Sequence, residues 1–328
     1  MSVFTLDILE QELSGAKKVG IAGHIRPDGD CIGSCTALYQ YLIQIRHELG
    51  IEQVHVYLEP FGQEFHILSG TDKIRHTFDF DDTYDVFITL DCSSIDRLGN
   101  SIRYFESAKR TICIDHHITN DKFADMNHVI ADASSTCEVL YDLLDDDRIN
   151  REIARSLYTG IVHDTGMFKH SNTTYKTMAA TANLLRKGID FTNIIDVTFV
   201  QKTYAQLQIL GRCLMESRLL MDGKVIFSSV NQKTLQLYDL SCSDLDGIID
   251  NLRTAKGCEV AIFIYETGKG EYKISMRSNG IVDVSKIVHL FGGGGHIKAA
   301  GCTMKGTDDD IINNLIPHIA KQLNAAEE

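Results

Sequence analysis

A chain of 328 residues, with 44% hydrophobic and 23% charged side chains, is long enough to form two globular domains with a core in each. Its formal net charge of −13 argues against a protein that grips long nucleic acid, because such proteins bind phosphates with a basic surface. No stretch approaches ~20 uninterrupted apolar residues and no secretory signal pattern opens the chain, so we expect neither a membrane span nor export. The nine cysteines form no Cys-x-x-Cys pair, which is typical of a reducing, cytoplasmic location.

The first half of the chain alternates between strand and helix patterns. Apolar runs predict strands over 17–25, 52–59, 84–94 and 109–117, and helical periodicity predicts helices over 31–50, 135–144 and 149–162. This alternation predicts an α/β fold with a mostly parallel sheet flanked by helices. In such sheets, ligands bind beyond the carboxyl ends of the strands.

The second half has a different pattern and predicts a smaller α/β domain. Helical patterns cover 174–188 and 202–220, strands are predicted over 223–230, 258–267 and 270–278, and helices over 243–255 and 309–325. A glycine-rich stretch, FGGGGHIKAAGCTM, lies between the last strand and the last helix. We therefore expect a catalytic domain over 1–190, a helical linker over 191–210 and a substrate-binding domain over 211–328.

Acidic and imidazole side chains lie at the ends of the predicted strands of the first domain. His24 stands at the end of the first strand, with Asp28 and Asp30 just beyond it, and the two aspartates, one residue apart, would repel each other without a positive group between them. Oxygen and imidazole ligands suit Mn²⁺, Fe²⁺, Zn²⁺ or Mg²⁺, and the whole set exceeds what one ion needs. It suits two ions about 3.5–4 Å apart, bridged by a carboxylate. The later members of the set are Asp91, Asp115, His116, His117 and Asp164.

Each of these motifs alone has an ordinary structural explanation. An Asp-x-Asp pair often caps a helix, adjacent histidines are common in cores and on surfaces, and an aspartate before Thr-Gly often forms a turn. A calcium site of the EF-hand type is excluded, because Ile32 occupies the third ligand position. Their joint occurrence at successive strand ends favours a metal site.

The order His-x-x-x-Asp-x-Asp, then a strand-end Asp, then Asp-His-His and Asp-Thr-Gly resembles the DHH phosphoesterase superfamily. The tail FGGGGHIKAAG, preceded by ISMRS, is similar to the C-terminal substrate domain of its first subfamily. Together these motifs most resemble the branch of nanoRNases (oligoribonucleases) and pAp phosphatases, which also includes soluble cyclic-dinucleotide phosphodiesterases. The resemblance spans nearly the whole chain.

The resemblance implies two divalent metal ions, with Mn²⁺ preferred. It implies that His117 faces the substrate phosphate and that Asp115 orients a histidine from outside the ligand set. Asp91 would bridge the two ions. The implied ligands are His24, Asp28 and Asp91 for one ion, and Asp30, Asp91, His116 and Asp164 for the other.

The glycine run predicts an anion site in the second domain. Successive glycines let backbone N–H groups converge on an anion, although a flexible surface hairpin has the same composition. Arg277 offers a planar fork suited to phosphate, although an ordinary surface arginine at a strand end is the alternative. The resemblance implies that Arg277 and His296 bind the terminal phosphate or nucleotide of the substrate. The expected substrate-binding residues are Arg277, Gly293, Gly294, Gly295, His296 and Lys298.

The implied activity is hydrolysis of short 5′-phosphorylated oligonucleotides and dinucleotides (nanoRNA, pApA, pGpG) and of pAp by a hydroxide that two metal ions activate. A soluble cyclic-dinucleotide phosphodiesterase and a non-catalytic nucleotide-binding sensor remain as alternatives. Length and charge disfavour an exonuclease that runs along long strands. The expected partners are short oligoribonucleotides or small nucleotides, with no long duplex nucleic acid and no membrane, and a homodimer is left open.

Overall fold

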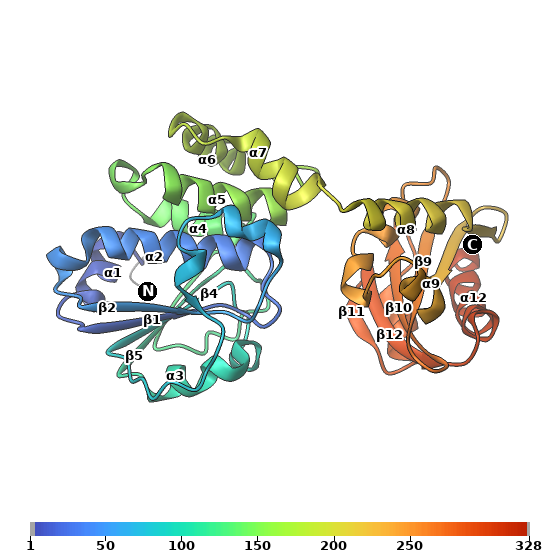
Figure 1. Ribbon diagram of the computed structural model, residues 1–328, viewed down its shortest axis with the longest axis horizontal. Helices are drawn as coiled ribbons and strands as arrows, with labels where there is room; N and C mark the ends of the chain where they lie inside the picture. Colours follow the sequence, from blue (N-terminus) through green and yellow to red (C-terminus); the bar gives the residue numbers. More distant parts are fainter. Residues whose placement is uncertain (1–3, 327–328) are drawn as a thin grey trace. The chain divides into compact units, whose positions relative to one another are not determined.

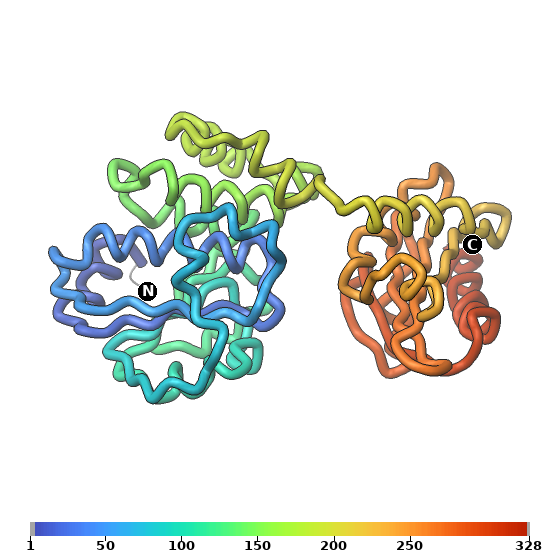
Figure 2. The backbone as a smooth tube through the Cα atoms, in the orientation of Figure 1, coloured from blue at the N-terminus to red at the C-terminus, as the bar shows by residue number. Residues whose placement is uncertain are grey.

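The computed structural model describes residues 4–326, which form two compact units, the first ending at Gln201 and the second beginning at Lys202 (Figures 1 and 2). Each unit has its own sheet and its own cores. The segment 191–210, predicted as a helical linker, contains α7 (Phe191–Ile195), a π-helical turn (Asp196–Val200) and the first half of α8 (Tyr204–Met215). Among the described residues, no helix has both the length and the apolar character that crossing a membrane requires.

The first unit is built on a six-stranded parallel sheet, which confirms the predicted α/β class. The strand order is β3-β2-β1-β4-β5-β6. The order reverses between β1 and β4, and the crevice at such a switch point is where open α/β sheets bind ligands. The strands are β1 (Lys18–Ala22), β2 (Gln53–Tyr57), β3 (Ile74–Arg75), β4 (Val86–Leu90), β5 (Arg110–Asp115) and β6 (Met126–Val129).

Helices cover both faces of this sheet. Alternate side chains of β4 enter different cores: Ile88 packs with the larger helical layer, and Phe87 packs with the side chains around α3. Figure 1 shows α2 and α5 over one face and α3 on the other. The helices are α1 (Leu6–Leu13), α2 (Gly29–Leu49), α3 (Ile102–Ser107), α4 (Thr136–Leu143), α5 (Arg151–Asp164) and α6 (Tyr175–Arg186), followed by α7.

The second unit has a mixed six-stranded sheet in the order β11-β12-β10-β9-β8-β7. β8 and β9 are parallel, and the other neighbours are antiparallel. One face packs on α11 and α12 and the other on α8, α9 and α10. Its elements after α8 are β7 (Arg218–Leu220), β8 (Val225–Val230), α9 (Gln232–Leu237), α10 (Ile248–Leu252), β9 (Val260–Gly268), β10 (Glu271–Ser278), α11 (Val284–His289), β11 (Gly294–His296), β12 (Ala299–Lys305) and α12 (Asp308–Asn324).

Two local predictions in the second half were wrong. The helix predicted over 202–220 ends at Met215, because Arg218–Leu220 pairs with β8 as β7. The helix predicted over 243–255 is interrupted at Gly247, whose φ of 82° lies in the left-handed region. Within the glycine-rich stretch, Gly294–His296 forms the edge strand β11, because pairing with β12 overrides the low strand preference of glycine.

Candidate metal centre

Each predicted ligand stands at the end of an element that fixes its backbone. His24 lies two residues beyond β1, and Asp28 caps α2 by accepting hydrogen bonds from the backbone N–H groups of Asp30 and Cys31. Asp91 follows β4 with a φ of 54°, a left-handed conformation that turns the chain sharply at the strand end. Asp164 is the last residue of α5.

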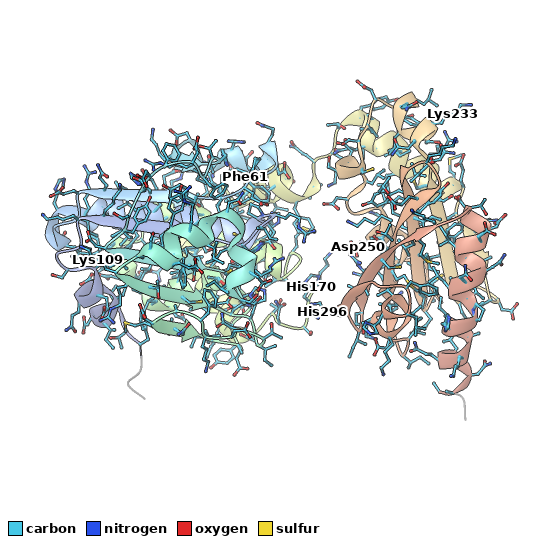
Figure 3. The ribbon with its side chains drawn as sticks, turned by 90° about the horizontal axis from the view of Figure 1, so that it is seen from below. Phe61, Lys109, His170, Lys233, Asp250 and His296 are labelled. Carbon is cyan, nitrogen blue, oxygen red and sulfur yellow. The ribbon has the colours of Figure 1, made fainter. Side chains whose placement is uncertain are left out.

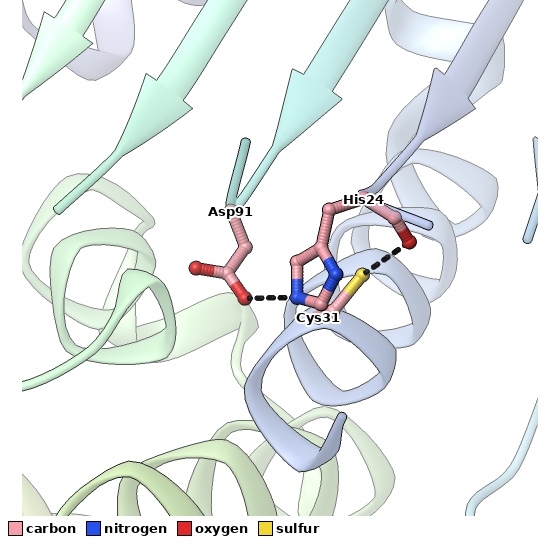
Figure 4. Close-up of side chains that lie close together, drawn as sticks. All are labelled: His24, Cys31 and Asp91. Carbon is pink, nitrogen blue, oxygen red and sulfur yellow. Dashed lines mark hydrogen bonds and ion pairs between the residues drawn. The ribbon is translucent and has the colours of Figure 1, made fainter. Parts of the chain in front are cut away.

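His24 presents one ring nitrogen to two carboxylates. Its Nδ1 lies 2.8 Å from the carbonyl oxygen of Ile25, so Nδ1 carries the proton and donates. Its Nε2 lies 3.4 Å from Oδ2 of Asp91 and 3.6 Å from Oδ2 of Asp28. The sulfur of Cys31 lies beside this group, where Figure 4 shows it with His24 and Asp91. Sequence analysis did not single out this thiol.

His116 makes the same arrangement on the other side of Asp91. Its Nδ1 donates to the carbonyl oxygen of Ala133 at 3.3 Å. Its Nε2 lies 3.2 Å from Oδ2 of Asp164, 3.7 Å from Oδ1 of Asp91 and 4.0 Å from Oδ2 of Asp30. Asp91 therefore directs one carboxylate oxygen toward each imidazole.

The N-terminus of α4 holds two of the carboxylates in place. The side-chain oxygens of Asp30, which is completely buried, accept the backbone N–H groups of Thr136 at 2.7 Å and Cys137 at 2.9 Å. The hydroxyl of Thr136 donates to Oδ1 of Asp91 at 3.1 Å. Sequence analysis missed these contacts because α4 lies about a hundred residues away in the chain. Helical periodicity predicted a helix over 135–144 but could not indicate which residues pack against its start.

His117 is oriented by Asp115, as the resemblance implied for one histidine. Its Nδ1 donates to Oδ1 of Asp115 at 2.8 Å, and the Nδ2 of Asn120 donates to Oδ2 of the same carboxylate at 2.7 Å. The hydrogen bond to Asp115 raises the pKa of His117. The Nε2 of His117 makes no hydrogen bond with the described residues, so it is free to meet a ligand.

The carboxylates gather around the two imidazoles, and each one disfavours the ionisation of its neighbours. Burial raises the pKa of Asp30 well above its usual value, and the neighbouring Asp91 raises it further. Burial and Asp91 also raise the pKa of Asp164 to about 8. Burial lowers the pKa of His24, but the surrounding acidic groups, led by Cys31 and Asp28, raise it to about 12. Divalent cations fit these residues, because two imidazole acceptors and several carboxylate oxygens converge and positive charge would relieve the repulsion.

A strained turn follows Asp164. Gly166, Met167 and Phe168 all have φ between 53° and 63°, in the left-handed region. The turn brings the chain back beside Asp164, where the Nδ1 of His170 donates to the carbonyl oxygen of Asp164 at 3.2 Å. Strain of this kind gathers at functional sites, and the sequence offered only the Thr-Gly pair as a signal for it.

The predicted residues of the second unit occupy one end of its sheet. Arg277 pairs with Ala299 in the β10–β12 ladder, and His296 pairs with Ala299 from the other side. The Nε of Arg277 lies 3.4 Å from Oδ1 of Asp250, which Figure 3 labels together with His296. The backbone N–H of Gly293 donates to Val288 and is thus not free for an anion.

Two more of these residues, Gly294 and Gly295, line a hollow of about 310 Å³ together with Ser285, Lys286 and His289. Lys298 lies in the turn between β11 and β12, where its carbonyl oxygen accepts the backbone N–H of Ser278. The structure therefore brings Arg277 and His296 into one row across the sheet, while Lys298 lies just outside the strands.

A doubly wound sheet with imidazoles and carboxylates gathered at its switch point defines an α/β protein suited to hold divalent cations. Residues 18–161 match the N-terminal domain of the DHH family, and residues 222–325 match the DHHA1 domain. The chain is 30% identical over 312 residues to the bifunctional oligoribonuclease and PAP phosphatase NrnA of Thermus thermophilus, covering 93% of this chain and 90% of that protein. It belongs to the DHH phosphoesterase family, which confirms the resemblance and the prediction of a hydrolase.

Other similarities agree with this assignment. The protein of the same name from Bacillus subtilis is 24% identical over 291 residues, covering 87% of this chain and 89% of that protein. The crystal structure of an exopolyphosphatase-related protein from Bacteroides fragilis has a TM-score of 0.88 and 24% identity, covering 98% of this chain and 97% of that chain. That structure supports the fold alone. Proteins of this family depend on metal ions, in agreement with the clustered ligands.

Proposed function

We propose that this protein hydrolyses short 5′-phosphorylated oligonucleotides, linear dinucleotides such as pApA and pGpG, and pAp. The observation that carries the proposal is the position of Asp91, whose Oδ2 lies 3.4 Å from Nε2 of His24 and whose Oδ1 lies 3.7 Å from Nε2 of His116. A carboxylate shared between two imidazoles is what a bridging ligand requires. The names of the relatives support the choice of substrates.

We propose Mn²⁺ as the ion, because a mixture of imidazole and carboxylate donors suits it better than Ca²⁺ or Mg²⁺. Two such ions would supply an activated water and offset the charge of the phosphate oxygens. Asp91 would be common to both sets. The proposed ligands are those implied by the sequence: His24, Asp28 and Asp91 on one side, and Asp30, Asp91, His116 and Asp164 on the other.

His117 is proposed to act on the substrate rather than to bind an ion. Asp115 holds its Nδ1 proton, which directs Nε2 outward as the reactive nitrogen. From that position Nε2 can stabilise charge on a phosphate oxygen or deliver a proton to the leaving oxygen. The raised pKa of His117 favours the protonated ring that both roles need.

In the second unit, Arg277, Gly293, Gly294, Gly295, His296 and Lys298 are proposed to bind the phosphate or nucleotide that is not cleaved. The exposed side chain of His296 and the fork of Arg277 in the same row support this role. The occupied N–H of Gly293 means that this glycine contributes shape rather than a donor. Nine free cysteines support a cytoplasmic location for the reaction.

The test is a substrate panel with purified, chelator-treated protein: pAp, pApA, a five-nucleotide RNA, a 30-nucleotide RNA and a cyclic dinucleotide. Mn²⁺ should restore hydrolysis of the short linear substrates better than Ca²⁺, and activity should fall as the RNA lengthens. Asp91→Asn should abolish turnover, while Asp79→Asn, an exposed aspartate elsewhere in the first unit, should not. If the wild type binds these nucleotides without turnover, the protein is a nucleotide-binding sensor. If it prefers the cyclic dinucleotide, it is a cyclic-dinucleotide phosphodiesterase.

A further inference from the structure

One face of the second sheet is left partly uncovered. Along β10, Tyr272, Ile274 and Met276 are buried toward α11 and α12, so Lys273 and Arg277 point to the opposite face. On that face α8, α9 and α10 pack over β8 and β9, where Ala261 and Phe263 are buried. Beyond β9 the face is open, because side chains of β10, β12 and β11 on this side are exposed or half-buried.

The ladder places four rows of side chains on this open face. Arg277, Ala299 and His296 form the first row across β10, β12 and β11. Lys273 and Thr303 form the third row, and Glu271 and Lys305 form the fourth. Between the Arg277 row and the Lys273 row lies the middle row, which consists of Ser275, Gly301 and Gly294.

The middle row has almost no side chains and therefore forms a shallow floor. A Cβ added to Gly294 would meet no atom within 4 Å, so this position opens to solvent. Positive groups stand at both ends of the floor, Arg277 at one end and Lys273 at the other. Asp250 already holds the Arg277 side chain, whereas the ammonium of Lys273 makes no ion pair with any residue of the described range 4–326.

The length of this surface exceeds that of one phosphate. Lys273 and Arg277 are four residues apart on one strand, which separates their Cα atoms by about 13 Å. A phosphate held by Arg277 and His296 therefore leaves Lys273 free for another. We propose that Lys273 is a further substrate-binding residue, which contacts a second phosphate of an oligonucleotide lying across Ser275, Gly301 and Gly294 and so favours chains of three or more nucleotides over pAp. This inference rests on the proposed function.

The test compares Lys273→Gln with Lys269→Gln, a matched exposed lysine in the turn before β10. With Mn²⁺, the ratio of kcat/KM for a trinucleotide to kcat/KM for pAp should fall on the order of 5-fold in Lys273→Gln and stay at the wild-type value in Lys269→Gln. The affinity of chelator-treated protein for a fluorescent trinucleotide should fall by a similar factor. Because Lys273 is exposed, neither variant should change the melting temperature.

A third variant, Lys286→Gln, tests the opposite side of β11, where this lysine lines the 310 Å³ hollow. An unchanged ratio and an unchanged trinucleotide affinity in Lys273→Gln would overturn the proposal. The proposal would also be overturned if Lys286→Gln lost trinucleotide affinity and Lys273→Gln did not, because the oligonucleotide would then lie along α11. The binding measurement needs no turnover. If the wild type cleaves neither substrate but Lys273→Gln still loses trinucleotide affinity, the proposed function fails while the binding surface stands.

Discussion

Nδ1 of His117 donates to Oδ1 of Asp115 at 2.8 Å, and this contact keeps a proton on Nδ1 and fixes the direction of the ring. Asp115→Asn keeps the shape but removes the carboxylate that holds the proton on Nδ1. We expect kcat to fall about 10- to 100-fold, with the Mn²⁺ content unchanged. Steady-state kinetics and elemental analysis of the same preparation check this. Loss of Mn²⁺ from the variant would show that Asp115 belongs to the metal ligands.

Thr136 supports Asp91 through its hydroxyl and Asp30 through its backbone. Thr136→Val removes only the hydroxyl and leaves a side chain of similar shape. Because Asp91 loses a hydrogen bond that orients it, we expect Mn²⁺ affinity to fall about 10-fold or more in a competition titration with a chelator. Thr181→Val, another buried threonine of the first unit, is the matched control. Equal Mn²⁺ affinities of the two variants would speak against the role of Thr136.

Gly33 allows α2 to approach α5 closely. A Cβ at this position would lie 2.6 Å from the carbonyl oxygen of Ser156, which is backbone and cannot move aside. Gly33→Ala should therefore lower the free energy of unfolding by about 1–3 kcal/mol in urea titrations. In Gly211→Ala, on α8, the new methyl meets nothing within 4 Å, and stability should stay the same or rise by up to ~1 kcal/mol. Equal stabilities of the two variants would contradict the close packing.

His55 makes stability depend on pH. Its Nε2 faces NH2 of Arg75 at 3.0 Å and must accept, so burial and the Arg75 charge lower the pKa of His55 from 6.5 to about 4. The unfolded chain takes up this proton first as the pH falls. The neutral His55 ring therefore contributes up to about 3 kcal/mol to the free energy of unfolding. This contribution is complete above pH 6.5 and is lost as the pH falls toward 4.

Denaturant titrations at pH 7 and pH 5 measure this loss of stability. His55→Asn should show a smaller loss between the two pH values than the wild type. Part of the loss should remain, because burial also lowers the pKa of His163 to about 4. An identical loss of stability in the wild type and in His55→Asn would rule out His55 as a source of the pH dependence.

Much of the fold and the position of the site could be predicted from sequence for a simple reason. The ligands lie within a few residues of strand or helix ends, and parallel strands bring their carboxyl ends to one edge. Local signals were strong there: Gly50 ends α2 in the left-handed conformation, and Asp28 caps its start.

The remaining features depend on partners that are distant in sequence. Nothing near Thr136 in the sequence indicates that its N–H meets Asp30, since only the folded sheet brings α4 there. The strand β11 likewise exists because β12 pairs with it, against the preference of Gly294 and Gly295. The break at Gly247 was not predicted, because the helical periodicity of 243–255 was given more weight than a single glycine.

The proposed metal centre depends on Asp91, which two divalent cations would share. Isothermal titration of chelator-treated protein with Mn²⁺ tests it most directly, because the stoichiometry does not depend on the choice of substrate. We expect two Mn²⁺ per wild-type chain and a loss of at least one of them in Asp91→Asn. A single Mn²⁺ in the wild type, or two Mn²⁺ still bound by Asp91→Asn, would contradict it.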